Sequence, residues 1–267
     1  MLHNLDNMLE EASRLLDAGQ LLQAETLYSQ ICELDPGNPE AWLMRGAIYG
    51  ERGDLQNAVQ SIQKSIELQA DSAEAYLTLG HVLNAQGRSQ EALECFQKAF
   101  QCDPVDEQAV CTLASFLKEQ GKTAEALSVL QNAVGDDPEL TEVWDMLGWL
   151  HSQYGRFADA ESSYQHSIAL APNNIPSLLG LGHVQMRLGR YADAVTSFRK
   201  VIELDPRHVD AHNHLGSALL AMGNVREAES VVQKADRIQP HNAETYANLA
   251  TILQLRGELF AAENKLR

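Results

Sequence analysis

The sequence predicts an all-α fold, a right-handed α-solenoid superhelix built from helix–turn–helix units. Three small-residue positions recur every 34 residues through the chain without an insertion. The first is always glycine, at Gly19, Gly53, Gly87, Gly121, Gly155, Gly189, Gly223 and Gly257. The second is always alanine, at Ala24, Ala58, Ala92, Ala126, Ala160, Ala194, Ala228 and Ala262. The third is Gly or Ala, at Ala12, Gly46, Gly80, Ala114, Gly148, Gly182, Gly216 and Ala250. A fixed period of this length is typical of stacked repeats.

Residues 39–72 show why each repeat is a pair of helices. Apolar residues at three- and four-residue steps precede the glycine, at Ala41, Leu43, Ile48 and Tyr49. A second such series follows it, at Leu55, Ala58, Val59, Ile62, Ile66 and Leu68. Because no stretch alternates with a period of two, these are amphipathic helices and not strands. Gly53 between them fits the left-handed position just past a helix C-terminus.

The boundaries between repeats carry turn and capping residues that recur with the same 34-residue period. Proline ends six of the seven complete repeats, at Pro36, Pro104, Pro138, Pro172, Pro206 and Pro240, and it cannot continue a helix. N-cap residues follow at Asn38, Ser72, Asp106, Asn174 and Asn242. First-turn acids, favoured by the helix dipole, come next at Glu40, Glu74, Glu142, Asp210 and Glu244.

These residues resemble the tetratricopeptide repeat. Residues 73–106 carry nearly the whole family pattern, with Tyr76, Leu79, Gly80, Gly87, Ala92, Phe96, Ala99 and Pro104. The resemblance covers about Leu5 to Arg267 and implies seven full repeats plus a truncated eighth, starting near residues 5, 39, 73, 107, 141, 175, 209 and 243. We expect one solenoid domain over residues 1–267. The sequence departs from the pattern at Glu11, Arg45, Ala70, His151 and Gln185.

Composition argues against several classes of partner. The net charge is −17, with 37 acidic and 20 basic residues, which disfavours nucleic acid and anionic membrane surfaces. No segment is long and apolar enough to insert into a membrane, and the N-terminus lacks a signal-peptide pattern. The four cysteines, Cys32, Cys95, Cys102 and Cys111, form no CxxC pair, so a reduced, cytoplasmic setting is expected.

Catalytic and metal-binding patterns are also missing from the sequence. The glycines are spaced by 34 residues and not grouped as in a phosphate loop, and neither GxSxG nor HExxH occurs. His208, His212 and His214 lie close together, but no carboxylate or cysteine completes a metal set, and His212 replaces a core residue. We expect no enzyme activity, no cofactor and no metal.

The predicted binding surface is a concave groove lined by the first helix of each repeat, as in arrays that this chain resembles. Places five and nine of a first helix share one face. The candidate peptide-binding residues are Leu43, Leu77, His81, Cys111, Asp145, Trp149, Leu179 and His183. Trp149 is the strongest candidate, because Trp144 already supplies the core tryptophan of its repeat. For the leucines an alternative stays open, namely that they only cover neighbouring helices.

Acidic residues border this groove, with an expected rim of Glu74, Glu119 and Glu142 against the bases Lys118 and Arg187. Such a rim predicts a basic or amphipathic protein segment as partner. The alternative is that the acids only serve the helix dipoles.

Two functions remain open from the sequence. The first is a non-enzymatic scaffold or adaptor that binds a protein segment in the groove. The second is an N-terminal substrate- or partner-recruiting arm of a larger bacterial enzyme, such as a glycosyltransferase or sulfotransferase. The chain stops at Arg267 inside a second helix, so Leu253, Leu255 and Leu259 lack a following repeat. We therefore expect self-association through this uncapped end.

Overall fold

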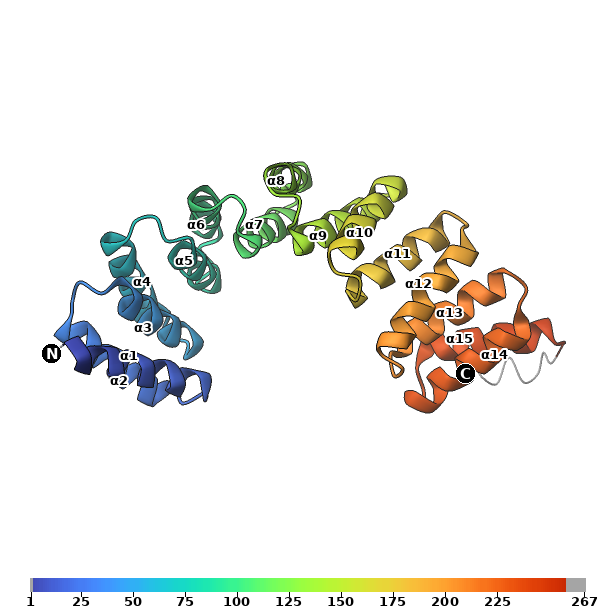
Figure 1. Ribbon diagram of the computed structural model, residues 1–267, viewed down its shortest axis with the longest axis horizontal. Helices are drawn as coiled ribbons and strands as arrows, with labels where there is room; N and C mark the ends of the chain where they lie inside the picture. The colour runs from blue at the N-terminus through green and yellow to red at the C-terminus, as the bar shows by residue number, and fades with distance from the viewer. Residues whose placement is uncertain (1, 258–267) are drawn as a thin grey trace. The chain divides into compact units, whose positions relative to one another are not determined.

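The computed structural model describes residues 2–257, with side chains from residue 5 onward. These residues form fifteen α-helices and no strand, so the predicted all-α repeat fold is confirmed (Figure 1). The sequence positions Leu259 and Ala262 lie outside the described residues. The helices are α1 (Leu2–Asp17), α2 (Leu21–Leu34), α3 (Pro39–Glu51), α4 (Leu55–Leu68), α5 (Ala73–Ala85), α6 (Ser89–Cys102), α7 (Glu107–Glu119), α8 (Thr123–Asp136), α9 (Thr141–Gln153), α10 (Phe157–Leu170), α11 (Ile175–Arg187), α12 (Tyr191–Leu204), α13 (Val209–Ala221), α14 (Val225–Ile238) and α15 (Ala243–Leu255).

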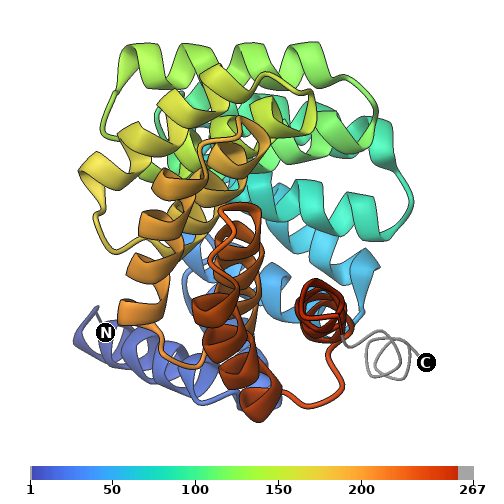
Figure 2. The same cartoon turned by 90° about the vertical axis from the view of Figure 1, so that its right-hand side faces the viewer.

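The helices gather into two compact units, which we call unit 1 (Met1–Asp137) and unit 2 (Pro138–Arg267). Unit 1 contains α1 to α8, and unit 2 contains α9 to α15. Within each unit, consecutive helices pack as antiparallel pairs (Figure 2). Seven first helices, from α3 to α15, begin within two residues of the repeat starts read from the sequence. The single domain expected over residues 1–267 stays a prediction.

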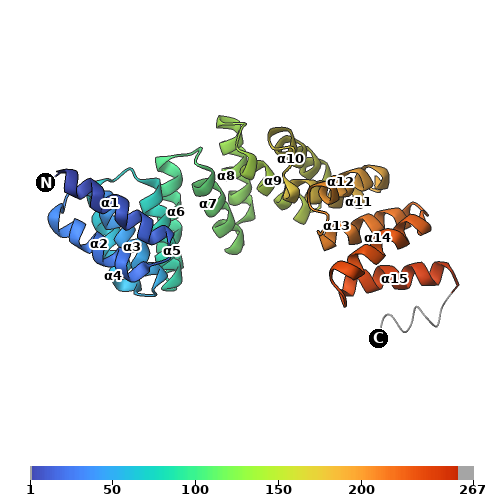
Figure 3. The same cartoon turned by 60° about the horizontal axis from the view of Figure 1, so that its bottom comes forward.

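First helices also pack on first helices of neighbouring repeats. In unit 1 this contact joins α3 to α5 and α5 to α7, and in unit 2 it joins α9 to α11, α11 to α13 and α13 to α15 (Figure 3). Because the first helices approach one another across repeats, they form the inner layer of each unit, and the inner layer of a curved stack is its concave face.

The repeated small residues have the two roles that their spacing predicts. Gly87, which ends α5, has a φ of +77°, a left-handed value that side chains with a Cβ rarely adopt. Gly80 instead permits contact between helices, since a Cβ added there would lie 2.4 Å from Cε1 of Phe96 on α6. Gly182 meets Phe198 in the same way, at 2.5 Å. In both repeats a phenylalanine ring of the second helix thus packs directly against the backbone of a glycine in the first helix.

The predicted N-caps all accept a hydrogen bond from a backbone N–H three residues later, at Asn38, Ser72, Asp106, Asn174 and Asn242. Two first helices begin differently. The residue before α9 is Leu140, whose side chain makes no capping bond. The residue before α13 is His208, whose Nδ1 accepts from the Ala211 N–H at 3.3 Å.

The fourth residue of three first helices donates a ring N–H to the proline carbonyl that ends the preceding repeat. The pairs are Trp42 Nε1 with Pro36 at 3.0 Å, Trp144 Nε1 with Pro138 at 2.9 Å and His212 Nε2 with Pro206 at 3.0 Å. Because a carbonyl only accepts, Nε2 of His212 carries the proton. His212 is buried and therefore replaces a tryptophan in both packing and hydrogen bonding.

None of the helices described between residues 2 and 257 combines the length and the apolar character that crossing a membrane requires.

Candidate functional site

The inner face of unit 1 contains a pocket of about 370 Å³ between α5, α6 and α7. Its lining is His81, Asn84, Phe96, Cys111, Thr112, Ser115, Phe116 and Glu119. The structure thus brings together three residues that the sequence analysis singled out, His81, Cys111 and Glu119. The His81 ring meets Phe96 edge-on, with 5.1 Å between centroids. Partial burial lowers the pKa of His81, so the imidazole is neutral at pH 7.

Two predicted groove leucines are not part of an accessible surface. Leu43 is 5% exposed and Leu77 is 4% exposed, because the inner face of each helix is covered where successive first helices meet. In this structure they therefore offer little apolar area to a ligand, and their role in peptide binding stays a prediction. Glu74 is exposed in the first turn of α5 and does not line the pocket of unit 1.

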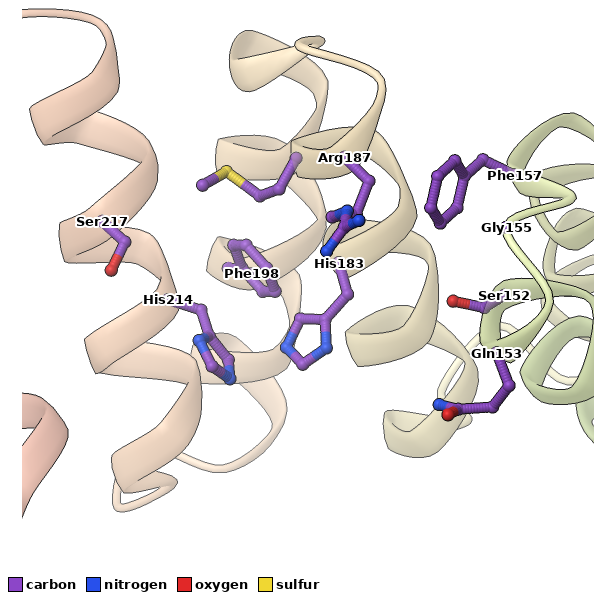
Figure 4. Close-up of a pocket in the computed structure, with 10 residues that line it drawn as sticks. Ser152, Gln153, Gly155, Phe157, His183, Arg187, Phe198, His214 and Ser217 are labelled. Atoms are coloured by element: carbon purple, nitrogen blue, oxygen red, sulfur yellow. The ribbon is translucent and has the colours of Figure 1, made fainter.

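The inner face of unit 2 contains a larger pocket of about 490 Å³ (Figure 4). Its lining is Ser152, Gln153, Gly155, Phe157, His183, Met186, Arg187, Phe198, His214 and Ser217, from five helices and one turn. No aspartate or glutamate lines it.

The wall of this pocket is organised around His183 on α11. Its ring stands edge-on to His214 of α13, with 4.1 Å between centroids, and also meets Phe198 at 5.7 Å. Partial desolvation and the neighbouring His214 lower the pKa of His183 to about 4. His214 is itself fixed by Glu244, whose Oε1 lies 3.0 Å from its Nδ1. At pH 7 a neutral imidazole therefore faces this pocket.

Trp149 lies on α9 beside the pocket of unit 2. Its side chain is 41% exposed, and Ser152 and Gln153 follow it on the same helix face one turn later. Leu179 is half-buried and packs against the core of unit 2. Glu142 is exposed in the first turn of α9. Of the predicted peptide-binding residues in this unit, Trp149 and His183 are exposed, whereas Asp145 and Leu179 are half-buried.

Asp145 has a structural role that the sequence did not indicate. Its Oδ1 accepts a hydrogen bond from Ser177 Oγ at 2.7 Å, and Ser177 Oγ lies 2.7 Å from Ser167 Oγ. Burial raises the pKa of Asp145, the Ser177 hydrogen bond opposes that rise, and Glu142 adds to it. The carboxylate thus links α9 to the buried hydroxyls of Ser177 on α11 and Ser167 on α10, while its role in peptide binding stays a prediction.

The clustered histidines do not converge on one point. His208 caps α13, His212 contacts Pro206, and His214 contacts Glu244. Over residues 2–257, no group of three or more His, Cys, Asp or Glu side chains is arranged to hold a metal ion.

Two family models agree with this architecture. Tetratricopeptide repeat models match residues 38–104, 111–175 and 179–243, which is 197 of the 267 residues. The chain belongs to the tetratricopeptide repeat family. A comparison of the sequence with curated proteins finds no significant match.

Solved structures show the same tetratricopeptide fold at low identity. PilF of Pseudomonas aeruginosa is 21% identical with a TM-score of 0.63, over 84% of this chain and 98% of that one. A repeat protein of Parabacteroides merdae is 20% identical with a TM-score of 0.61, over 85% and 90% of the two chains. The C-terminal part of a Cytophaga hutchinsonii repeat protein is 15% identical with a TM-score of 0.70, over 90% and 98%. Tetratricopeptide arrays are scaffolds for protein–protein interactions, with extended concave surfaces.

The tetratricopeptide pattern does not predict all of the residues that line the pocket of unit 2. Phe157 and Phe198 come from second helices, where large residues are assigned to the core. Arg187 was recognised only as a base near the groove, and its guanidinium lies over the Phe157 ring, 5.2 Å from the centroid. The signal that was available is the unusual pair of histidines, His183 and His214, at inner-face positions of adjacent repeats.

Proposed function

We propose that this tetratricopeptide protein is a non-enzymatic scaffold that binds a protein segment on the inner faces of its first helices. The observation that carries the proposal is Trp149. It is a large aromatic side chain, 41% exposed, on the inner layer of unit 2, one turn from the pocket. Exposed aromatics of this kind are enriched among the residues that contribute most to binding. In each unit the pocket is lined by residues of first helices, which supports the choice of that unit's inner layer as the binding surface.

The partner of unit 1 is a basic or amphipathic segment. Residues 1–137 contain 22 acidic and 8 basic residues, a net charge of −14, whereas residues 138–267 contain 15 and 12, a net charge of −3. The potential around unit 1 therefore accelerates the approach of cationic segments and slows that of anionic ones. Glu119 in the pocket of unit 1 and the exposed Glu74 in the first turn of α5 both add to this negative potential.

A peptide selection on the full chain tests this proposal. Random peptides displayed on phage are selected against the wild-type protein, and affinities of the selected peptides are measured by fluorescence anisotropy. Trp149→Ala should weaken peptides of the unit 2 surface by about 1–3 kcal/mol, which is roughly 5- to 150-fold. Glu142→Gln should change affinity little and should mainly alter the association rate, because rim charges act on encounter.

The matched control is Leu170→Ala, since Leu170 is also 41% exposed but lies on α10, a second helix. If Leu170→Ala weakened the selected peptides and Trp149→Ala did not, binding would have to occur on the outer layer.

Self-association is a further part of the proposal. Leu255 is 60% exposed at the end of α15 and Leu253 is half-buried, and both would contribute to such a contact. Sedimentation velocity at several protein concentrations measures it. The recruiting-arm alternative concerns residues beyond this chain and stays a prediction.

A further inference from the structure

The pocket of unit 2 has a counterpart in unit 1, three repeats earlier in the sequence. Subtracting 102 residues converts five of its lining residues into lining residues of the other pocket. The pairs are His183 with His81, Met186 with Asn84, Phe198 with Phe96, His214 with Thr112 and Ser217 with Ser115. In both pockets the histidine meets the phenylalanine edge-on. The two pockets are therefore versions of one architecture, and their differences indicate what each selects.

The differences concern charge. The residue equivalent to Arg187 is Ala85, and the residue equivalent to Gln153 is Glu51. Glu119 lines the pocket of unit 1, whereas no carboxylate lines the pocket of unit 2. Where unit 1 has Ala85 and Glu51, unit 2 has an arginine and a glutamine, and both of these side chains carry N–H donors.

The Arg187 guanidinium lines the pocket of unit 2 and is available to bind an anion. Within residues 2–257 it makes no ion pair or hydrogen bond, and its guanidinium lies 5.2 Å from the centroid of the Phe157 ring. Four other arginines of unit 2 are paired, namely Arg156 with Asp159, Arg190 with Glu161, Arg199 with Glu227 and Arg256 with Glu229. Arg207, Arg226 and Arg237 are unpaired within residues 2–257, but only Arg187 lines the pocket. A cation–π contact with an aromatic ring uses the face of the guanidinium and does not consume its N–H donors.

The neighbours of Arg187 are donors as well. Ser152 and Gln153 point into the pocket from α9, and the neutral imidazole of His183 supplies one further N–H (Figure 4). At the other end, Glu244 accepts from His214 and makes that side unfavourable for an anion. Phe157, Met186 and Phe198 provide apolar wall between these ends.

We propose that the pocket of unit 2 recognises a protein segment in which a glutamate or aspartate side chain follows a large apolar side chain. The carboxylate binds the guanidinium of Arg187 with help from Gln153 and Ser152, and the apolar side chain fills the space against Phe198. The proposal rests on the scaffold function proposed above and deepens it. It assigns to unit 2 a preference opposite to that of unit 1.

Three blocked peptides test it on the full chain: acetyl-Ser-Phe-Glu-Ser-amide and the same peptide with Gln or Lys in place of Glu. Binding is followed by NMR through the imidazole signals of His183 and His81 and the guanidinium signal of Arg187. The Glu peptide should shift His183 and Arg187 and bind at least about 10-fold more tightly than the Gln peptide, since a charge-assisted hydrogen bond exceeds a neutral one. It should leave His81 unchanged.

The key variant is Arg187→Gln, which should bring the Glu and Gln peptides within about 2-fold of each other, because the charge-assisted bond is lost. The matched control is Arg199→Gln, which removes an exposed arginine that pairs with Glu227 on the outer layer and should keep the preference. Equal binding of the Glu and Gln peptides to the wild-type protein would overturn the proposal, as would tighter binding of the Lys peptide.

Failure of this proposal is distinguishable from failure of the scaffold function. If all three peptides shift His183 equally and Trp149→Ala weakens them all, the surface binds segments and only the carboxylate preference is wrong. If none shifts His183 at millimolar concentration, the pocket proposal is wrong, while the phage selection with Trp149→Ala judges the scaffold function independently.

Discussion

At the scale of single residues, Gly80 shows how closely the paired helices approach. An alanine Cβ there would lie 2.4 Å from Cε1 of Phe96, a distance that forces the ring to move. We expect Gly80→Ala to destabilise the protein by about 1–3 kcal/mol, as overpacking does, measured by urea denaturation. Gly135→Ala is the matched control, because Gly135 lies in α8 with nothing within 4 Å of the added Cβ. It should be neutral or stabilising by up to about 1 kcal/mol. Equal losses in the two variants would contradict this account.

His151 gives a prediction about pH. It is 5% exposed, and its Nδ1 has no hydrogen-bond partner within the described residues. Burial lowers the pKa of His151, and Arg156 lowers it further, although Asp159 opposes the shift. In the unfolded chain the pKa of a histidine is about 6.5. As pH falls through that value, the unfolded state takes up a proton that the folded state resists, so stability decreases.

His151→Leu removes this contribution. Thermal melting between about pH 7.5 and pH 5 should show a smaller loss of stability for the variant than for the wild type, given the unfolded pKa near 6.5. Identical pH slopes in the two proteins would show that His151 is protonated as easily in the folded state as in the unfolded one.

Residue-level prediction of the site was partial, for a physical reason. A helical wheel identifies the face on which Leu43 and Leu77 lie. It does not show whether the first helix of the next repeat covers that face, and this contact decides whether the face is accessible. The hydrogen bond of Asp145 was not predicted for the same reason, because its partner Ser177 is 32 residues away in the sequence. Trp149 and His183 could be found, because their types are unusual at positions where other repeats carry small or polar residues.

At the scale of helices, the capping residues explain why α7 begins at Glu107. Asp106 Oδ1 accepts from the Ala109 N–H at 2.7 Å and satisfies a backbone donor that the helix itself cannot. Asp106→Ala should cost about 1 kcal/mol, and hydrogen exchange should show faster opening of the first turn of α7. The control is Lys122→Ala at the start of α8, where the wild-type side chain makes no capping bond. A loss as large in the control would mean that the Asp106 bond is not the cause.

The helices themselves were predictable because each boundary has a local cause. Turn glycines, prolines and caps lie within a few residues of the ends that they determine, so one sequence suffices to locate them. The exceptions are α9, which follows the buried Leu140, and α13, which a histidine caps. Neither residue is a usual cap, and only the three-dimensional packing around them explains why the helices begin there.

At the scale of the whole molecule, the uneven charge predicts an uneven response to salt. Unit 1 has a net charge of −14 and unit 2 a net charge of −3, so self-repulsion destabilises unit 1 more. Raising NaCl from about 0.1 M to about 1 M shortens the Debye length from about 10 Å to about 3 Å. Hydrogen exchange measured by mass spectrometry should then show a larger gain of protection in α3 to α7 than in α9 to α13. Equal gains in both units would refute the electrostatic explanation.

The indole–proline hydrogen bonds also give the protein two built-in probes. The Trp42 N–H is held by the Pro36 carbonyl in unit 1, and the Trp144 N–H is held by the Pro138 carbonyl in unit 2. Each bond joins the proline that ends one repeat to the first helix of the next. In a nitrogen-15-labelled sample, the indole resonances of Trp42 and Trp144 therefore report on unit 1 and unit 2 separately, without a fluorophore or spin label being attached. An experimenter could watch a ligand stabilise one half of the molecule while the other half serves as the reference.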